Sequence, residues 1–206
     1  MKNSHIYAGC VLLVSLALTA AVAQTRLNSG QIATSLQGVT GTPLRMTAAQ
    51  MRQTALENIR LHPGSAVGRP PLFPELESLA QFTVEVNFDF GSAAIRPESY
   101  RTVGAIADAL HNPILLSYGF LVIGHTDAVG GRQYNLDLSQ RRAEAIRAAL
   151  IDPFGINPAV LEAVGLGEEQ LRDRQHPDSA VNRRVQLINV GRKFCFGGSG
   201  ERVPCR

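Results

Sequence analysis

The chain of 206 residues has little excess of charge of either sign. Its 20 basic and 17 acidic residues leave a formal net charge of +3. That balance argues against nucleic acid as a partner, because binding to a phosphate backbone depends on a strongly basic surface. The chain has no evident internal repeat, and its length allows one ordinary domain with extensions.

Cysteine and the common catalytic motifs are also scarce. No cysteine lies between residues 11 and 194, and neither Gly-x-Ser-x-Gly nor His-Glu-x-x-His occurs. His125 and Asp127 could be two metal ligands or an acid–base pair, but a catalytic zinc site needs three protein ligands. The other histidines lie in unrelated contexts. We therefore predict a protein that is not an enzyme and that needs no metal or cofactor, with His125 as a strand-end residue beside a pocket.

Long apolar runs are missing except at the N-terminus. Residues 1–23 read as a signal peptide, with Lys2 as its positive start, an apolar core over 9–20 and a small-residue cleavage site ending at Ala23. The core is short for a membrane span, and an uncleaved anchor is the alternative. Cys10 precedes most of this core, so we interpret it as part of the signal and not as a lipidation site. The signal therefore predicts an exported protein.

The two remaining cysteines lie in a short tail, residues 191–206. They are Cys195 and Cys205. Paired cysteines in an exported chain predict a disulfide bond. Closing so short a loop contributes roughly 3 kcal/mol in the chain-entropy model. A pair of free thiols is the alternative.

Residues 24–80 are predicted to be an N-terminal extension. Residues 31–36 fit one or two helical turns, and residues 47–61 fit a helix that opens with a capping box. A Pro-rich stretch, 68–74, then reads as a stiff connector. Short helices are marginal in isolation, so these either dock on the domain or a partner or remain unstable.

Residues 81–190 are predicted to form the domain proper. Apolar residues alternate from Phe82 to Phe90, which indicates a half-buried strand. A helix is expected from Pro97 to Leu110. Further strands are expected at 120–123, 160–164 and 185–190, and a second helix from Ser139 to near Pro153. The predicted fold class is an α/β sandwich (α+β), with one mixed β-sheet and helices packed on one face.

The segment from 123 to 143 carries the strongest functional signal. Asp127 follows the most apolar strand, and Ser139 is a natural N-cap. This would place Arg142, with Arg141 beside it, in the first turn of a helix, where each cation opposes the helix dipole at a cost of up to ~1 kcal/mol. Such rule-breaking is typical of binding sites. An acid beside a base can hold a ligand that carries both an ammonium and a carboxylate. The alternative is that Arg142 simply pairs with Asp127 or Glu144.

Three blocks of sequence resemble the OmpA-like peptidoglycan-associating domain, the family shared by outer-membrane protein A, the Pal lipoproteins and the stator protein MotB. They match in order and spacing over about residues 82 to 190. The matching residues are Phe88-Asp89-Phe90-Gly91-Ser92-Ala93 with Arg96-Pro97-Glu98; Gly124-His125-Thr126-Asp127 with Gly130, Tyr134-Asn135, Leu138-Ser139 and Arg141-Arg142-Ala143; and Gly165-Leu166-Gly167-Glu168 with Asn182-Arg183-Arg184-Val185.

The resemblance implies a function as well as a fold. Domains of this family grip diaminopimelate in the peptide stems of peptidoglycan, and Asp127 and Arg142 match the acid and base that bind it. Thr126 and Asn135 are further candidates for the pocket because both are polar and lie in the signature. The resemblance also implies a location in the periplasm, with association with the outer membrane as an option. Outer-membrane or other envelope proteins would be additional partners. The rival hypotheses are a partner-binding envelope protein that acts through residues 24–80, and a cell-wall hydrolase.

Overall fold

The fold is a four-stranded mixed sheet with helices on both faces, seen in a computed structural model that describes residues 28–38, 44, 46–196 and 202–204. The strand order is β1-β4-β2-β3, with β2 and β3 parallel and the other neighbours antiparallel. The helices are α1 (Ser29–Gln37), α2 (Ala48–Leu61), α3 (Tyr100–Leu110) and α4 (Arg132–Ile151), and the sheet strands are β1 (Gln81–Val84), β2 (Tyr118–His125), β3 (Leu161–Gly167) and β4 (Val185–Arg192). Short 3-10 turns, η1 (Pro74–Ser78), η2 (Pro97–Ser99), η3 (Pro158–Val160) and η4 (Ala180–Asn182), link them. The predicted α+β class with one mixed sheet is confirmed, but the helices cover both faces of the sheet and not one, because α2 and η1 of the predicted extension pack on the second face.

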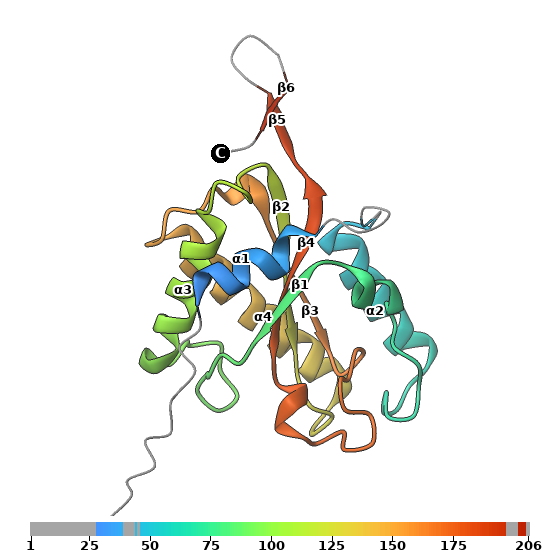
Figure 1. Cartoon of the computed structure of the whole chain (residues 1–206). Coiled ribbons are helices and arrows are strands. Elements are labelled where there is room, and N and C mark those ends of the chain that lie inside the picture. Colours follow the sequence, from blue (N-terminus) through green and yellow to red (C-terminus); the bar gives the residue numbers. More distant parts are fainter. Residues whose placement is uncertain (1–27, 39–43, 45, 197–201, 205–206) are drawn as a thin grey trace, which may run out of the picture.

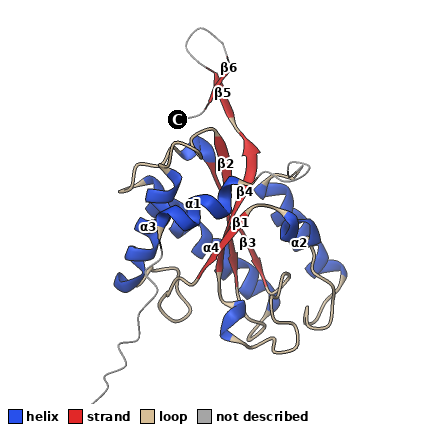
Figure 2. Cartoon of the chain, viewed as in Figure 1, coloured by secondary structure: helices blue, strands red, loops and turns tan. Residues whose placement is uncertain are grey.

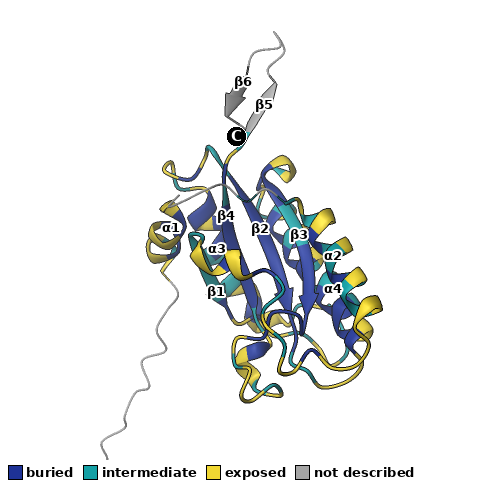
Figure 3. Ribbon diagram, turned by 90° about the vertical axis from the view of Figure 1, so that its right-hand side faces the viewer, coloured by how far each residue is buried: buried dark blue, intermediate teal, exposed yellow. Residues whose placement is uncertain are grey.

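Both faces of the sheet are buried. Successive side chains of β2 point in opposite directions, so this strand contributes to both faces. Phe120 and Val122 belong to one hydrophobic cluster, whereas Leu121 and Ile123 belong to another. Strands β2, β3 and β4 are buried along most of their length, β1 is half-buried, and the helices keep exposed outer surfaces (Figure 3). A continuous apolar run is therefore what a central strand with two covered faces requires.

The first face carries the helices α3 and α4, as predicted, and also α1. Ile32 and Leu36 of α1 are fully buried in the same cluster as Phe120. The carbonyl of Leu36 accepts a 2.7 Å hydrogen bond from the buried amide of Asn189 in β4. Figure 1 shows α1 and α3 on one side of the strands and α2 on the other.

The second face is covered by α2 and η1, which come from the predicted extension. Thr47 and Gln50 form the expected capping box at the start of α2, and Met51 and Ala55 are fully buried against the sheet. Both short helices therefore dock on the domain of their own chain, and this docking resolves the alternative that the sequence left open. Neither helix needs to be stable alone, because tertiary packing stabilises it.

The connector between α2 and η1 is held by buried polar side chains that follow β3. Arg132, at the start of α4, forms an ion pair with Glu169 at 2.5 Å and also donates to the carbonyls of His62 and Gly64. Glu168 accepts from the backbone N–H of Ala66 at 3.1 Å. These bonds fix the start of α4 and the connector to the same end of the sheet.

Two element boundaries differ from the prediction. Strand β1 ends at Val84, and Phe88 makes only an isolated bridge to Ile95, so the alternation from Phe82 to Phe90 does not form one strand. Phe90 is fully exposed. The chain turns away from the sheet after β1 because residues 87–96 form a loop closed by their own backbone hydrogen bonds.

Helix α4 begins eight residues earlier than predicted, since its N-cap is Gly131 and not Ser139. It starts at Arg132, with Gly131 at the N-cap position, and runs without interruption to Ile151 (Figure 2). Ser139 is therefore not an N-cap. It is fully buried in the middle of the helix, where its hydroxyl donates to the carbonyl of Leu136 at 2.9 Å and accepts from the N–H of Gly167 at 2.8 Å.

The tail forms a small hairpin of β5 (Phe194–Phe196) and β6 (Arg202–Pro204), in which Cys195 lies opposite Val203. Cys205 lies outside the described residues, so the disulfide bond to Cys195 stays a prediction. Residues 1–23, the predicted signal peptide, also lie outside them. Within the described ranges, none of the helices is long and apolar enough to cross a membrane.

Candidate ligand-binding site

Asp127 stands directly beyond the end of β2, in a loop that several hydrogen bonds hold in place. The N–H of Thr126 donates to the carbonyl of Gly167 at 3.1 Å, and that of Ala128 donates to the carbonyl of Pro177 at 2.9 Å. One carboxylate oxygen of Asp127 accepts from the N–H of Val129 at 3.3 Å. The other forms a 2.7 Å ion pair with Arg183. The side chain of Asp127 is 14% exposed, so its carboxylate is largely sheltered yet still reaches solvent.

Arg142 lies in the middle of α4, near the same end of the sheet. Its Nε donates to the carbonyl of Ser92 at 3.0 Å, and its guanidinium stacks over the ring of Phe88 with a 4.8 Å distance to the centroid. Burial lowers the pKa of Arg142, while the charges of Tyr134 and Asp127 oppose that shift. Among the described residues, no ion pair joins Arg142 to Asp127 or to Glu144.

This position corrects the reasoning from the helix dipole. Arg141 and Arg142 lie far from the first turn of α4, which begins at Arg132. The dipole's effect falls off within the first turn, so these arginines neither oppose it nor share an anion with free backbone N–H groups. Tertiary contacts hold Arg142 in place: a hydrogen bond to the loop at Ser92 and a cation–π contact with the ring of Phe88.

The free atoms of Arg142 define what the site can do. Nε and the ring contact anchor the side chain, whereas neither terminal nitrogen has a hydrogen-bond acceptor within the described part of the chain. A guanidinium fixed in this way presents its terminal N–H groups for a bidentate contact with a carboxylate. The nearby carboxylate of Asp127 supplies the opposite charge.

Asn135 and Thr126, the other predicted pocket residues, are both buried. The amide nitrogen of Asn135 donates to the carbonyls of Asp127 and Val129 and to Glu168, at distances of 3.3, 3.2 and 2.8 Å. Asn135 therefore fixes the loop that carries Asp127. The hydroxyl of Thr126 is buried and has no hydrogen-bond partner among the described residues.

His125 faces the opposite side of the sheet from Arg142. It is buried, and its Nε2 lies 3.0 Å from the amide oxygen of Gln186. Burial, reinforced by the nearby charge of Arg184, holds its pKa well below the ordinary value of 6.5. His125 is thus a neutral core residue. Groups of three or more His, Cys, Asp or Glu residues with metal-binding geometry do not occur in the described ranges.

Sequence reasoning missed the residues that position the two charged groups. Arg183 pairs with Asp127, Phe88 and Ser92 hold Arg142, and Glu168 holds Asn135. All of these lie in the three sequence blocks described above. The blocks are far apart in the chain, but the fold brings their polar residues to one end of the sheet. The sequence signal that could have identified these residues was their position in the three blocks.

Comparison with known proteins places this region in a family. The model of the OmpA family matches residues 87–184. The chain is 34% identical over 115 residues to outer membrane porin F of Pseudomonas aeruginosa, covering 55% of this chain and 32% of the porin. It is 36% identical over 104 residues to the peptidoglycan-associated lipoprotein of the same organism, covering 48% of this chain and 58% of the lipoprotein.

A solved structure also matches about half of the chain. The peptidoglycan-associated lipoprotein of Burkholderia pseudomallei is 33% identical, with 52% of this chain and 88% of that chain covered and a TM-score of 0.43. The chain spans about a third of the length of porin F and over half of the length of the peptidoglycan-associated lipoprotein of Pseudomonas aeruginosa.

Proposed function

Because the chain carries a domain of the OmpA family, we propose that it binds peptidoglycan non-covalently, through the diaminopimelate of the peptide stems. Asp127 would pair with the ammonium of the free amino-acid end, and Arg142 would grip its carboxylate. The protein would act in the periplasm and contribute to the integrity of the cell envelope. A relative that is named as peptidoglycan-associated supports this ligand class.

The unpartnered terminal nitrogens of Arg142 are the observation that carries the proposal. A half-buried guanidinium without an acceptor loses solvation and gains no hydrogen bonds in return, unless a ligand supplies them. A carboxylate does so in bidentate geometry, at roughly 1.5–3 kcal/mol for each charge-assisted hydrogen bond. The anchoring of Arg142 by Ser92 and Phe88 means that little side-chain freedom is lost on binding.

Diaminopimelate fits this pair better than lysine does. Diaminopimelate and lysine both carry a side-chain ammonium, but only diaminopimelate carries a carboxylate on the same carbon. A lysine stem would satisfy Asp127 and leave Arg142 without a partner. A single contact of this kind is weak and reversible, and the polymeric wall would strengthen it by avidity if the protein is tethered or oligomeric.

The burial of apolar residues in the extension favours wall binding over a partner-binding function of that segment. Its main apolar residues, Ile32, Leu36, Met51 and Ala55, are buried inside this chain and are not free to bind a partner. Envelope proteins therefore remain secondary partners in the proposal. They would bind a protein already held at the wall.

Sedimentation with insoluble peptidoglycan tests the proposal. The wild-type protein should sediment with walls that contain diaminopimelate and poorly with walls that contain lysine. Asp127→Asn and Arg142→Gln should each lose most binding, by more than the ~1 kcal/mol of a surface ion pair, because each leaves the other ligand group unmatched. Arg141→Gln is the matched control, since Arg141 is the exposed neighbour of Arg142.

Circular dichroism on all variants separates loss of binding from loss of fold. Wall binding by Asp127→Asn and Arg142→Gln at the wild-type level, with unchanged spectra, would exclude this site. Equal binding to both wall types would reject diaminopimelate as the recognised group.

A further inference from the structure

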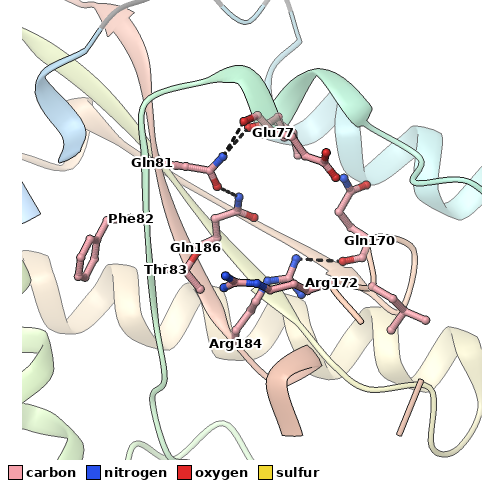
Figure 4. Close-up of a pocket in the computed structure, with 10 residues that line it drawn as sticks. Glu77, Gln81, Phe82, Thr83, Gln170, Arg172, Arg184 and Gln186 are labelled. Atoms are coloured by element: carbon pink, nitrogen blue, oxygen red, sulfur yellow. Dashed lines mark hydrogen bonds between the residues drawn. The ribbon is translucent and has the colours of Figure 1, made fainter. Parts of the chain in front are cut away.

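A second polar cavity, separate from Asp127 and Arg142, lies against the face of the sheet that α2 and η1 cover. Its volume is about 500 Å³. Its lining comes from η1, from β1, from the start of β4 and from the segment after β3 (Figure 4). The polar and charged residues that line it are Glu77, Gln81, Thr83, Gln170, Arg172, Arg184 and Gln186.

Two arginines reach this cavity without a carboxylate partner. Arg184 donates to the carbonyls of Gln170 and Asn182, at 3.0 and 3.4 Å, and Arg172 has no side-chain acceptor within the described residues. Neither forms an ion pair there, in contrast to Arg52, Arg132 and Arg183, each of which pairs with an acid. The fold therefore keeps two guanidiniums at one cavity with their charges uncompensated by direct contact.

Arg184 is charged at neutral pH. Burial and the charge of Arg172 lower the pKa of Arg184 to about 10, and the charge of Glu77 opposes the shift. Arg184 thus stays protonated although its surroundings disfavour the charge. An anion bound between the two guanidiniums would relieve both the desolvation and the mutual repulsion.

The neutral amides of the cavity form a preorganised wall. Gln186 donates to Gln81, which donates to the carbonyls of Leu76 and Glu77 at 3.1 Å (Figure 4). Gln170 accepts from and donates to the backbone of Phe73, both at 3.1 Å. These amides are occupied with one another and with the backbone. The groups that remain for a ligand are the two arginines and the hydroxyl of Thr83, which has no hydrogen bond within the described residues. The carboxylate of Glu77 also lines the cavity and, in the described part of the chain, forms no ion pair with either arginine.

We propose that this cavity binds a phosphate group, with Arg172 and Arg184 as charge partners and the Thr83 hydroxyl as a neutral donor. Guanidinium forks match the oxygens of phosphate, and Arg is the preferred side chain for this contact. The phosphate group belongs either to a small soluble molecule or to a phospholipid head group. This site goes beyond the proposed wall binding and does not depend on it.

Calorimetric titration of the full chain with inorganic phosphate, at constant ionic strength, tests the site. We expect saturable binding that Arg172→Gln and Arg184→Gln each weaken about tenfold or more, through loss of charge-assisted hydrogen bonds. Arg174→Gln is the matched control, because Arg174 is exposed nearby and does not line the cavity. Asp127→Asn should bind phosphate normally, which separates this site from the wall site.

Arg172→Gln keeps the test decisive if Arg184→Gln fails to fold, because the Arg172 side chain is exposed and has no partner to lose. Absence of saturable binding, or equal binding by the Arg172 and Arg174 variants, would overturn the proposal. Vesicles of phosphatidylcholine with and without phosphatidylglycerol distinguish the sources. Binding that requires phosphatidylglycerol, that Arg172→Gln weakens and that inorganic phosphate competes away identifies a head group. Phosphate binding without vesicle binding identifies a soluble ligand.

Discussion

Asp127 forms its ion pair with Arg183, at 2.7 Å, and not with Arg142. The two partners are 56 positions apart in the chain. Arg183 therefore occupies one oxygen of the carboxylate that we propose for the ligand's ammonium, and it adds a positive charge beside it. Arg183 and the ammonium of the ligand would therefore compete for the carboxylate of Asp127.

Replacing Arg183 by Gln should tighten wall binding several-fold. The substitution removes both the competitor for Asp127 and the repulsion of an incoming ammonium. Folding stability should change by less than about 1 kcal/mol, because the Arg183 side chain is 50% exposed and surface ion pairs contribute little. Binding to diaminopimelate-containing walls and urea denaturation measure the two effects. Weaker wall binding in a folded variant would contradict the competition.

Ser139 should behave as a buried helix residue and not as a cap. Ser139→Ala leaves the N–H of Gly167 without its 2.8 Å acceptor and should cost about 1–3 kcal/mol. Ser139→Asp, which an N-cap would tolerate, should cost more than about 3 kcal/mol because it buries an unpaired charge. Thr47→Asp is the control, since Thr47 is a genuine N-cap and Asp is a good capping residue. Similar stability of the two Asp variants in urea would show that Ser139 is not buried as described.

Gly165 should not tolerate even a methyl group. A Cβ at this position would lie 2.0 Å from the backbone nitrogen of Gln140, because α4 packs directly on β3. Gly165→Ala should therefore cost about 3 kcal/mol and should also weaken wall binding, since any shift of α4 moves Arg142. Gly104→Ala in α3 is the control: its nearest neighbour is the ring of Phe154 at 3.4 Å, and Ala is the better helix former. Equal thermal stability of the two variants would refute this close approach.

His125 should make the fold sensitive to acid. Its pKa is held well below 6.5 in the folded protein, chiefly by burial, so the unfolded chain binds a proton that the folded chain does not. This contribution of His125 to the free energy of unfolding is fully present above about pH 6.5. As the pH falls toward the folded pKa, the free energy of unfolding decreases by up to about 1.4 kcal/mol per pH unit.

His125→Gln should remove this part of the pH dependence, whereas His111→Gln, at an exposed position, should not. Denaturation between pH 7.5 and 5 measures the slope. The same slope in wild type and His125→Gln would show that His125 is protonated freely in the folded state.

Local patterns in the sequence were sufficient for most of the elements. The apolar run at 120–123 predicted a central strand and the capping box at Thr47 predicted the start of α2, because each signal depends on neighbours within a few residues. The start of α4 could not be predicted in this way. Gly131 offers no side-chain cap, and Asn135 and Ser139 suggest a loop and a cap unless their partners Glu168 and Gly167 are known.

The sequence by itself determined the alternation of strands and helices and the identity of the charged residues, Asp127 and Arg142, at the end of one strand and in the following helix. Only the tertiary structure decided that Arg183 pairs with the acid, that Phe88 and Ser92 hold the base, and that two further arginines share a cavity on the opposite face. The physical reason is distance along the chain. The periodicity of apolar residues and the capping signals are local and can be read from neighbouring residues. Ion pairs and buried polar contacts join segments that meet only when the sheet has formed.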